Sequence, residues 1–258
     1  MRSVTAALLA QAGHDPAVER QLQALFQPAP HPWPPHLPAE DHSAWTLPLD
    51  ALAPLLLAEG RLAALVPAVA DRWPRTRQVA HAGGRLCAER ALAALRGQPA
   101  ATQAIGRRPD GSAQWPAGWT GSITHDRQSV TAAVAATRRV RGLGIDSEDI
   151  PAIGIAADVA AMCCTTRERQ ALNPPGGLDA RRVAVTFAAK EAYYKAVAPR
   201  VGRYVDFEEV EVTDIDLDQR RCTVTVNGQR PDLQALAATA SARWIEAEGT
   251  LHLLLAIG

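Results

Sequence analysis

The chain has 258 residues, of which 47% are hydrophobic and 21% are charged. This composition is typical of a globular protein with a substantial core, and it excludes fibrous, intrinsically disordered and disulfide-framework chains. Lys and Arg total 27, as do Asp and Glu, so no overall positive charge attracts a phosphate backbone and we expect no nucleic-acid partner.

The cysteines and the N-terminus bear on where the protein works. None of the four cysteines has the paired spacing of a zinc site, and neighbouring Cys163 and Cys164 are poor disulfide partners. Residues 1 to 12 carry one Arg and a short Ala/Leu run, which is too short to span a membrane. We therefore expect a cytoplasmic protein without membrane contact.

The first part of the chain is predicted to be helical and then to form strands. Prolines make an extended loop of residues 28–38, and one or two short helices follow within 49–69. Residues 75–95 favour a long helix, with the stop signal Gly97 just beyond. After a loop rich in Pro and Gly, we predict strands at 119–124 and 129–136.

The remaining chain alternates between strands and helices. A strand is predicted at 142–146, and residues 151–180 combine a helix with the turn NPPGG, where a mobile segment would lie. Residues 181–198 predict a helix stopped by Pro199, because proline lacks the backbone donor. The last predicted elements are three strands, at 208–214, 222–226 and 250–257.

Two short motifs contain candidate carboxylates, and the second of them also contains the only two lysines of the chain. In GLGIDSE, Asp146 and Glu148 are two residues apart, so an extended backbone places them on one side, where both could reach one Mg²⁺. In FAAKEAYYKA, Glu191 and Lys195 share a helix face. Taken singly, the first also fits a solvated strand end and the second a surface ion pair.

Further candidates are cationic or polar. Arg77 and Arg85 are eight residues apart, about two helical turns, so both could line one stripe of the helix. Arg107 and Arg108 follow in the loop, and arginine forks suit phosphates. In WPAGWTGSITHD, Thr124 and His125 end a strand and could hydrogen-bond a phosphate. Each of these side chains also fits a purely structural or solvated role.

Four blocks, in this order, resemble the 4'-phosphopantetheinyl transferases of the long type, which includes the surfactin and enterobactin-synthase activators. The blocks are AGGRLCAERAL (82–92), WPAGWTGSITH (115–125), GLGIDSE (142–148) and FAAKEAYYKA (187–196). The resemblance implies an α+β fold of two similar α/β halves that form a pseudo-dimer, with coenzyme A in the crevice between them. The halves would be residues 1–140 and 141–258.

The resemblance also implies an activity. Such enzymes move the phosphopantetheine arm of coenzyme A onto a serine of an acyl, peptidyl or aryl carrier protein, with Mg²⁺ on the pyrophosphate, and release 3',5'-ADP. Long-type members usually act as monomers, in secondary metabolism such as siderophore biosynthesis. The carrier is expected to be acidic and helical, and residues 151–180 would be its docking segment.

Roles for individual residues follow from the same resemblance. The metal carboxylates would be Asp146, Glu148 and Glu191. Glu191 would also be the base that takes the proton of the carrier serine. The catalytic residues would be Glu191, Lys195 and Asp146. The residues that would contact coenzyme A are Arg77, Arg85, Arg107, Arg108, Thr124, His125, Lys190 and Lys195. Ala113 stands where the family usually has Pro, so the sequence does not decide between Arg107 and Arg108.

Two other functions fit the same residues. One is a catalytically silent module that binds coenzyme A or a carrier protein, and the other is a Mg²⁺-dependent nucleotide phosphohydrolase. The presence of all three carboxylates and both lysines counts against the first. The second would use water as the nucleophile, so release of 3',5'-ADP without any apo-carrier would favour it.

Overall fold

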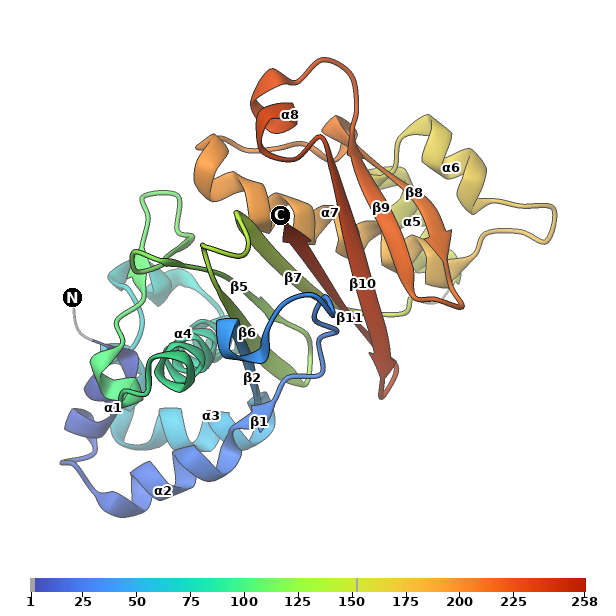
Figure 1. Ribbon diagram of the computed structural model, residues 1–258. Coiled ribbons are helices and arrows are strands. Elements are labelled where there is room, and N and C mark those ends of the chain that lie inside the picture. The colour runs from blue at the N-terminus through green and yellow to red at the C-terminus, as the bar shows by residue number, and fades with distance from the viewer. Residues whose placement is uncertain (1–2, 152) are drawn as a thin grey trace. The chain divides into compact units, whose positions relative to one another are not determined.

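A computed structural model describes residues 3–151 and 153–258 of the chain. Residues 1 and 2, from the N-terminal stretch, and residue 152, from the predicted docking segment, lie outside the described part. The described chain divides into two compact units (Figure 1). One comprises residues 1–29 and 38–136, and the other comprises residues 30–37 and 137–258.

The first unit is a four-stranded antiparallel sheet, ordered β1-β2-β6-β5, covered by helices. Its α-helices and strands are α1 (Val4–Gln11), α2 (Pro16–Leu25), β1 (Gln27–Pro28), β2 (His42–Pro48), α3 (Leu49–Leu57), α4 (Arg75–Arg96), β3 (Gly106–Arg107), β4 (Ala113–Gln114), β5 (Trp119–His125) and β6 (Ser129–Ala136), of which β3 and β4 pair as a separate two-stranded sheet. Short 3₁₀ turns lie at η1 (Ala39–Asp41), η2 (Ala58–Ala64), η3 (Ala68–Arg72) and η4 (Ala100–Thr102).

Helix α4 lies close against the sheet of the first unit because two of its residues lack side chains. A Cβ added at Gly83 would lie 2.7 Å from Leu52 and Val130, and one at Gly84 would lie 2.6 Å from Ile123. Such spacings leave no room for a methyl group. The helix ends at Gly97, whose φ of 61° is the left-handed conformation that glycine adopts without strain.

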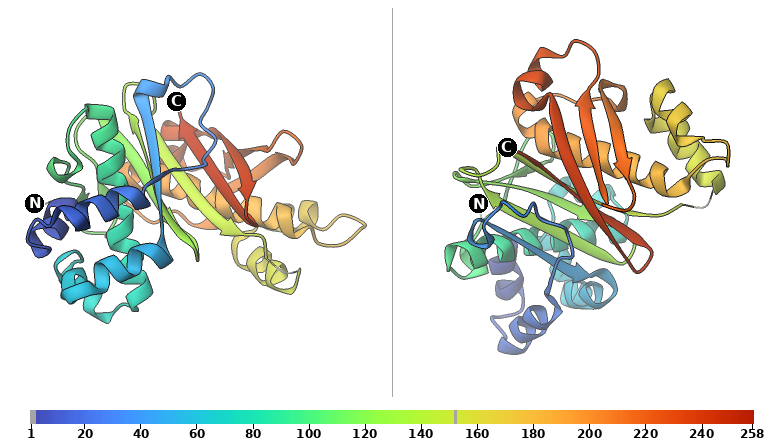
Figure 2. Two further views of the ribbon diagram at one scale, coloured as in Figure 1. Left: turned by 90° about the horizontal axis from the view of Figure 1, so that it is seen from below. Right: turned by 45° about the vertical axis from the view of Figure 1, so that its right-hand side comes forward.

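The second unit repeats this plan with a five-stranded antiparallel sheet, ordered β7-β11-β10-β9-β8, and one long helix (Figure 2). Its elements are β7 (Gly142–Asp149), α5 (Ile153–Cys163), α6 (Thr166–Leu172), α7 (Ala180–Val201), η5 (Phe207–Glu209), β8 (Val210–Asp216), β9 (Arg221–Val226), α8 (Pro231–Ala237), β10 (Thr239–Ala247) and β11 (Thr250–Ile257). The mixed helix and sheet content confirms the predicted α+β class.

Residues 30–37 interrupt the first unit along the chain and pack with the second. The buried ring of His31 lies edge-on against the ring of His252 on β11, with 5.5 Å between centroids. Next to this contact, the Ser147 hydroxyl lies 3.0 Å from Nδ1 of His252. The predicted extended loop at 28–38 is confirmed apart from Pro28, which ends β1.

Several elements differ from the prediction. Helix α7 continues through Pro199 to Val201, because a proline in the last turn removes a single hydrogen bond and Gly202 then ends the helix with φ 70°. Strand β7 extends to Asp149. Helices α1, α2 and α8 and strands β2 and β10 were not predicted. Within residues 3–151 and 153–258, no helix has the length and apolar character needed to cross a bilayer.

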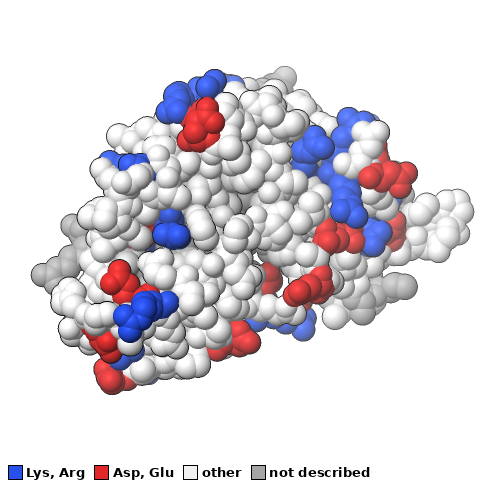
Figure 3. All heavy atoms as spheres, turned by 60° about the horizontal axis from the view of Figure 1, so that its bottom comes forward, with Lys and Arg blue, Asp and Glu red and all other residues white. Residues whose placement is uncertain are grey.

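The state of the cysteines and the distribution of surface charges are those expected from the sequence. All four cysteines are buried and none forms a disulfide. On the face shown in Figure 3, cationic and anionic side chains occur as small interspersed groups.

Candidate active site

The carboxylates of β7 lie on the side of the strand that faces helix α7. A Cβ at Gly144 would lie 1.8 Å from the carbonyl oxygen of Ala192, so this position marks the face in contact with the helix. Side chains alternate along a strand, so Asp146 and Glu148 point to the same side as Gly144, whereas Ser147 points to the other. The prediction that the two carboxylates share a side is confirmed.

Lys195 joins α7 to β7 at this point. Its Nζ donates to Oδ1 of Asp146 at 2.6 Å and to the carbonyl oxygen of Ile145 at 3.3 Å. The Asp146 side chain is only 4% exposed, whereas Lys195 is 25% exposed and reaches solvent. Glu191 lies one turn before Lys195 on the same helix face.

The electrostatics show that the three carboxylates act on one another. Burial first, and then the charges of Asp146 and Glu191, against the opposing charge of Lys195, raise the pKa of Glu148 to about 8. The pKa of Glu191 is also raised, first by burial and then by the charge of Asp146. The structure therefore brings Asp146, Glu148, Glu191 and Lys195 into one mutually interacting site.

The carboxylates do not form a closed set of metal ligands. Within residues 3–151 and 153–258, no three His, Cys, Asp or Glu side chains are arranged to hold a metal ion. At Asp146 the cation in contact with the carboxylate is the ammonium of Lys195.

Lys190 does not take the position that the resemblance implied. Its side chain is fully buried and its Nζ donates to the Glu168 carboxylate at 2.7 Å. Two further bonds go to the carbonyl oxygens of Cys163 at 2.9 Å and Phe207 at 2.7 Å. These three acceptors use all the donors of an ammonium group. The expectation that Lys190 contacts coenzyme A is therefore corrected: it fastens α7 to α6 and to η5.

The predicted arginines of the first unit lie around helix α4 and the adjoining loop. Arg85 donates from Nη1 to the carbonyl oxygens of Ile105 and Gly106, which fixes the start of β3 against the helix. Burial lowers the pKa of Arg85 to about 10, and the nearby charge of Arg107 contributes to the lowering. Arg77 lies over the Trp73 ring, with 4.8 Å from Cζ to the ring centroid.

The strand end with Thr124 and His125 approaches α4 next to Arg85. The close contact between Ile123 and Gly84 places the following two residues of β5 just beyond the crossing point. Thr124 is buried and His125 is exposed.

Sequence reasoning missed one residue of this group, His81, which lies midway between Arg77 and Arg85 along the helix. Its ring packs edge-on against Trp73, with 5.4 Å between centroids. Burial, followed by the charges of Arg85, Arg107 and Arg77, lowers its pKa to about 4. The spacing of four residues to each arginine is visible in the sequence and could have indicated it.

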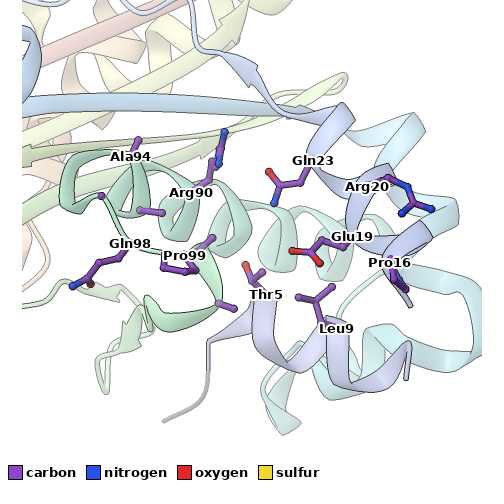
Figure 4. A pocket seen from close by; sticks show the side chains of 14 residues that line it. Thr5, Leu9, Pro16, Glu19, Arg20, Gln23, Arg90, Ala94, Gln98 and Pro99 are labelled. Atoms are coloured by element: carbon purple, nitrogen blue, oxygen red, sulfur yellow. The ribbon is translucent and has the colours of Figure 1, made fainter. Parts of the chain in front are cut away.

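A cavity of about 880 Å³ lies elsewhere in the first unit, between α1, α2 and the end of α4 (Figure 4). Thr5, Glu19 and Arg90 are among its lining residues, and none of the predicted site residues lines it. We therefore do not assign the transfer chemistry to it.

Comparisons with known proteins agree with the two units. Residues 142–246 match the model of the 4'-phosphopantetheinyl transferase superfamily, and residues 67–135 match that of the 4'-phosphopantetheinyl transferase N-terminal domain. The chain is 36% identical over 176 residues to the 4'-phosphopantetheinyl transferase Npt of Nocardia iowensis, which covers 65% of this chain and 76% of the relative.

Two further relatives carry the same enzyme name. The 4'-phosphopantetheinyl transferase Svp of Streptomyces mobaraensis is 35% identical over 67% of this chain and 69% of its own length. The 4'-phosphopantetheinyl transferase PptT of Mycobacterium tuberculosis is 34% identical over 50% of this chain and 55% of its own.

The chain therefore belongs to the 4'-phosphopantetheinyl transferase superfamily, in the long type that has an N-terminal domain. It is a transferase of this type, with coenzyme A as substrate and a carrier protein as partner. The resemblance in the four sequence blocks is thus confirmed at the level of family and activity.

Proposed function

We propose that this enzyme transfers phosphopantetheine with Mg²⁺ held by Asp146, Glu148 and Glu191, and that it releases 3',5'-ADP. The chemistry of the donors supports this proposal, because carboxylate oxygens suit Mg²⁺, which usually takes one or two of them together with substrate phosphates and waters. A set of ligands completed by the substrate also accounts for carboxylates that do not form a closed cage by themselves.

The grouping of the three carboxylates where β7 contacts α7 carries this assignment furthest, and the raised pKa values of Glu148 and Glu191 agree with it. Burial and mutual repulsion disfavour ionised carboxylates, and a divalent cation at the site would relieve both effects. When bound, the metal would neutralise negative charge on the pyrophosphate of coenzyme A.

Lys195 and Glu191 would have separate tasks at the pyrophosphate. Lys195 can offer its ammonium to a phosphate oxygen, because it is partly exposed and already contacts Asp146 in this site. Glu191 would accept the proton of the carrier serine as that oxygen attacks phosphorus, directly or through a water.

The first unit would bind the 3'-phosphoadenosine portion of coenzyme A. Arg77, Arg85 and Arg107 are brought together around α4, with Thr124 and His125 at the neighbouring strand end. Arg107, not Arg108, is the loop residue whose charge acts on Arg85 and His81. We therefore propose that Arg107 makes the main contact from this segment to coenzyme A, and that Arg108 has a secondary role.

The carrier protein would dock on the segment 151–180. Helix α5 presents Ile155 and Met162, seven residues apart, as exposed apolar side chains at 58% and 63% exposure. Spacing of this kind forms one stripe on a helix, and an apolar stripe on the surface suits a helical partner. The predicted roles in siderophore or other secondary metabolism, the monomeric state and the cytoplasmic location belong to this proposal.

The test is mass spectrometry of apo-carriers of acyl, peptidyl and aryl type incubated with the enzyme, coenzyme A and Mg²⁺. The expected result is the added mass of one phosphopantetheine arm on at least one carrier and a matching amount of 3',5'-ADP. Omitting Mg²⁺ with a chelator should stop the reaction. Release of 3',5'-ADP at full rate without any carrier would instead indicate a hydrolase.

A further inference from the structure

His81 lies at the centre of a cationic cluster that we define as Arg77, His81, Arg85 and Arg107. The first three are four residues apart on α4, and this spacing places them on one stripe of the helix. Arg107 joins them because Arg85 holds the carbonyl oxygen of the preceding residue, Gly106. All four residues belong to the first unit.

Protein carboxylates lie near the cluster but form no ion pair with it in the described residues. Across residues 3–151 and 153–258, none of its three arginines forms an ion pair. Glu89 influences Arg85, but its carboxylate accepts hydrogen bonds from Ser3, Val4 and Thr5 at the start of α1. Asp110, the acidic residue near Arg107, accepts two bonds from Ser112. Three arginines that are gathered without an ion pair in the described residues favour an anionic ligand.

His81 contributes a neutral donor to this cluster. With its pKa lowered to about 4, the imidazole is uncharged near pH 7 and carries one N–H and one bare nitrogen. In the described chain, neither nitrogen has a hydrogen-bond partner, and the half-buried ring is held by its contact with Trp73. The ring is thus fixed in orientation while its polar atoms stay available to a ligand.

We propose that His81 binds the 3'-phosphate of coenzyme A, donating a hydrogen bond to a phosphate oxygen between the guanidinium groups of Arg77 and Arg85. This inference rests on the proposed function and adds a ligand to it. A phosphate monoester approaches two negative charges at pH 7 and has three acceptor oxygens, which matches three cations and a neutral donor. The pyrophosphate, by contrast, is assigned to the carboxylates and Lys195 of the second unit.

The test compares two nucleotides that differ only in the 3'-phosphate. Adenosine 3',5'-bisphosphate and adenosine 5'-monophosphate are titrated calorimetrically into the wild-type enzyme and into His81→Leu, which keeps an apolar contact for Trp73. Loss of a hydrogen bond to a charged group should raise the Kd for the bisphosphate about 10- to 100-fold. The Kd for the monophosphate should stay the same.

Two further variants separate folding from binding. His81→Gln retains an amide donor and should recover part of the affinity, while His36→Leu, at an exposed histidine, should leave both Kd values unchanged. Equal Kd values for wild type, His81→Leu and His81→Gln would overturn the role of His81, and so would equal weakening for both nucleotides. Failure of the wild-type enzyme to bind the bisphosphate would instead overturn the proposed nucleotide site.

Discussion

Lys195 and Asp146 form an ion pair, 2.6 Å from Nζ to Oδ1, that joins helix α7 to strand β7 at the edge of solvent. The pair combines a buried anion with a partly exposed cation. In the proposed site, a substrate phosphate would share the ammonium of Lys195, and the Asp146 carboxylate would be a ligand for the proposed Mg²⁺. This arrangement explains why the two residues are best tested separately.

Asp146→Asn keeps the shape of the side chain and removes its charge. We expect transfer to fall at least about 100-fold, because Lys195 and the proposed Mg²⁺ would both lose a charged partner. Carrier modification followed by mass spectrometry measures this loss. Asp149→Asn, on the same strand but at the opposite face, is the matched control and should retain activity. Undiminished turnover of the Asp146 variant would exclude its assignment as a metal ligand.

Glu191→Gln tests the proton acceptor. We expect kcat to fall by about 10² to 10⁴, since an amide cannot take the serine proton. Calorimetric affinity for coenzyme A should change far less. If affinity and turnover decline in parallel, Glu191 contributes to binding and the base must be sought elsewhere.

Replacing Lys190 is predicted to affect the stability of the fold, whereas replacing Lys195 is predicted to affect coenzyme A binding as well. Lys190→Met should lower the free energy of unfolding by about 3–5 kcal/mol, because it leaves the buried carboxylate of Glu168 without its cation. Lys195→Met leaves the buried Asp146 carboxylate without its cation and should also lower stability, but unlike Lys190→Met it should weaken coenzyme A binding. Denaturant unfolding and calorimetry of both variants check this. A Lys190 variant of normal stability with weakened coenzyme A binding would contradict the structural role.

Glu89 predicts a pH dependence of stability. Burial raises its pKa to about 7, against an ordinary value of 4.5, so between these pH values the folded chain holds a proton that the unfolded chain releases. Rising pH therefore favours unfolding, by about 3 kcal/mol over this range. Glu89→Gln should reduce the pH slope of denaturant unfolding by the contribution of this one group, while Glu148 and Glu191 keep theirs, and the exposed Glu19→Gln should leave the slope unchanged.

Regular patterns made much of the fold predictable. Long helices with clear stop signals, such as 75–96, and strands rich in β-branched residues were found close to their true bounds. Strand β10 was missed because its buried positions are Ala240, Ala242 and Trp244, and alternation of small residues gives little strand signal. Its place is set by pairing with β9 and β11, which is a tertiary effect.

The site was predictable where chemistry follows from spacing and less so where it depends on packing. Asp146 and Glu148 share a face because a strand alternates, whatever surrounds it. Lys190 and Lys195 look equivalent in sequence, yet rotation along the helix places one in the interior beside Glu168 and the other at the surface. Only the fold of α6, which brings Glu168 to α7, separates them. His81 likewise becomes recognisable once Trp73 and Arg107 are placed around it.

Residues 30–37 pack with the second unit although they lie within the sequence of the first, and this matters when the two units are expressed separately. A fragment beginning at residue 138 would hold every element of the second unit from β7 to β11 but would lack the His31 ring that covers His252. That truncation would uncover the back of the strand pair whose front holds the proposed metal ligands. Separate expression of the C-terminal half would therefore need the 30–37 peptide restored, either as a fused leader or as a peptide added in trans.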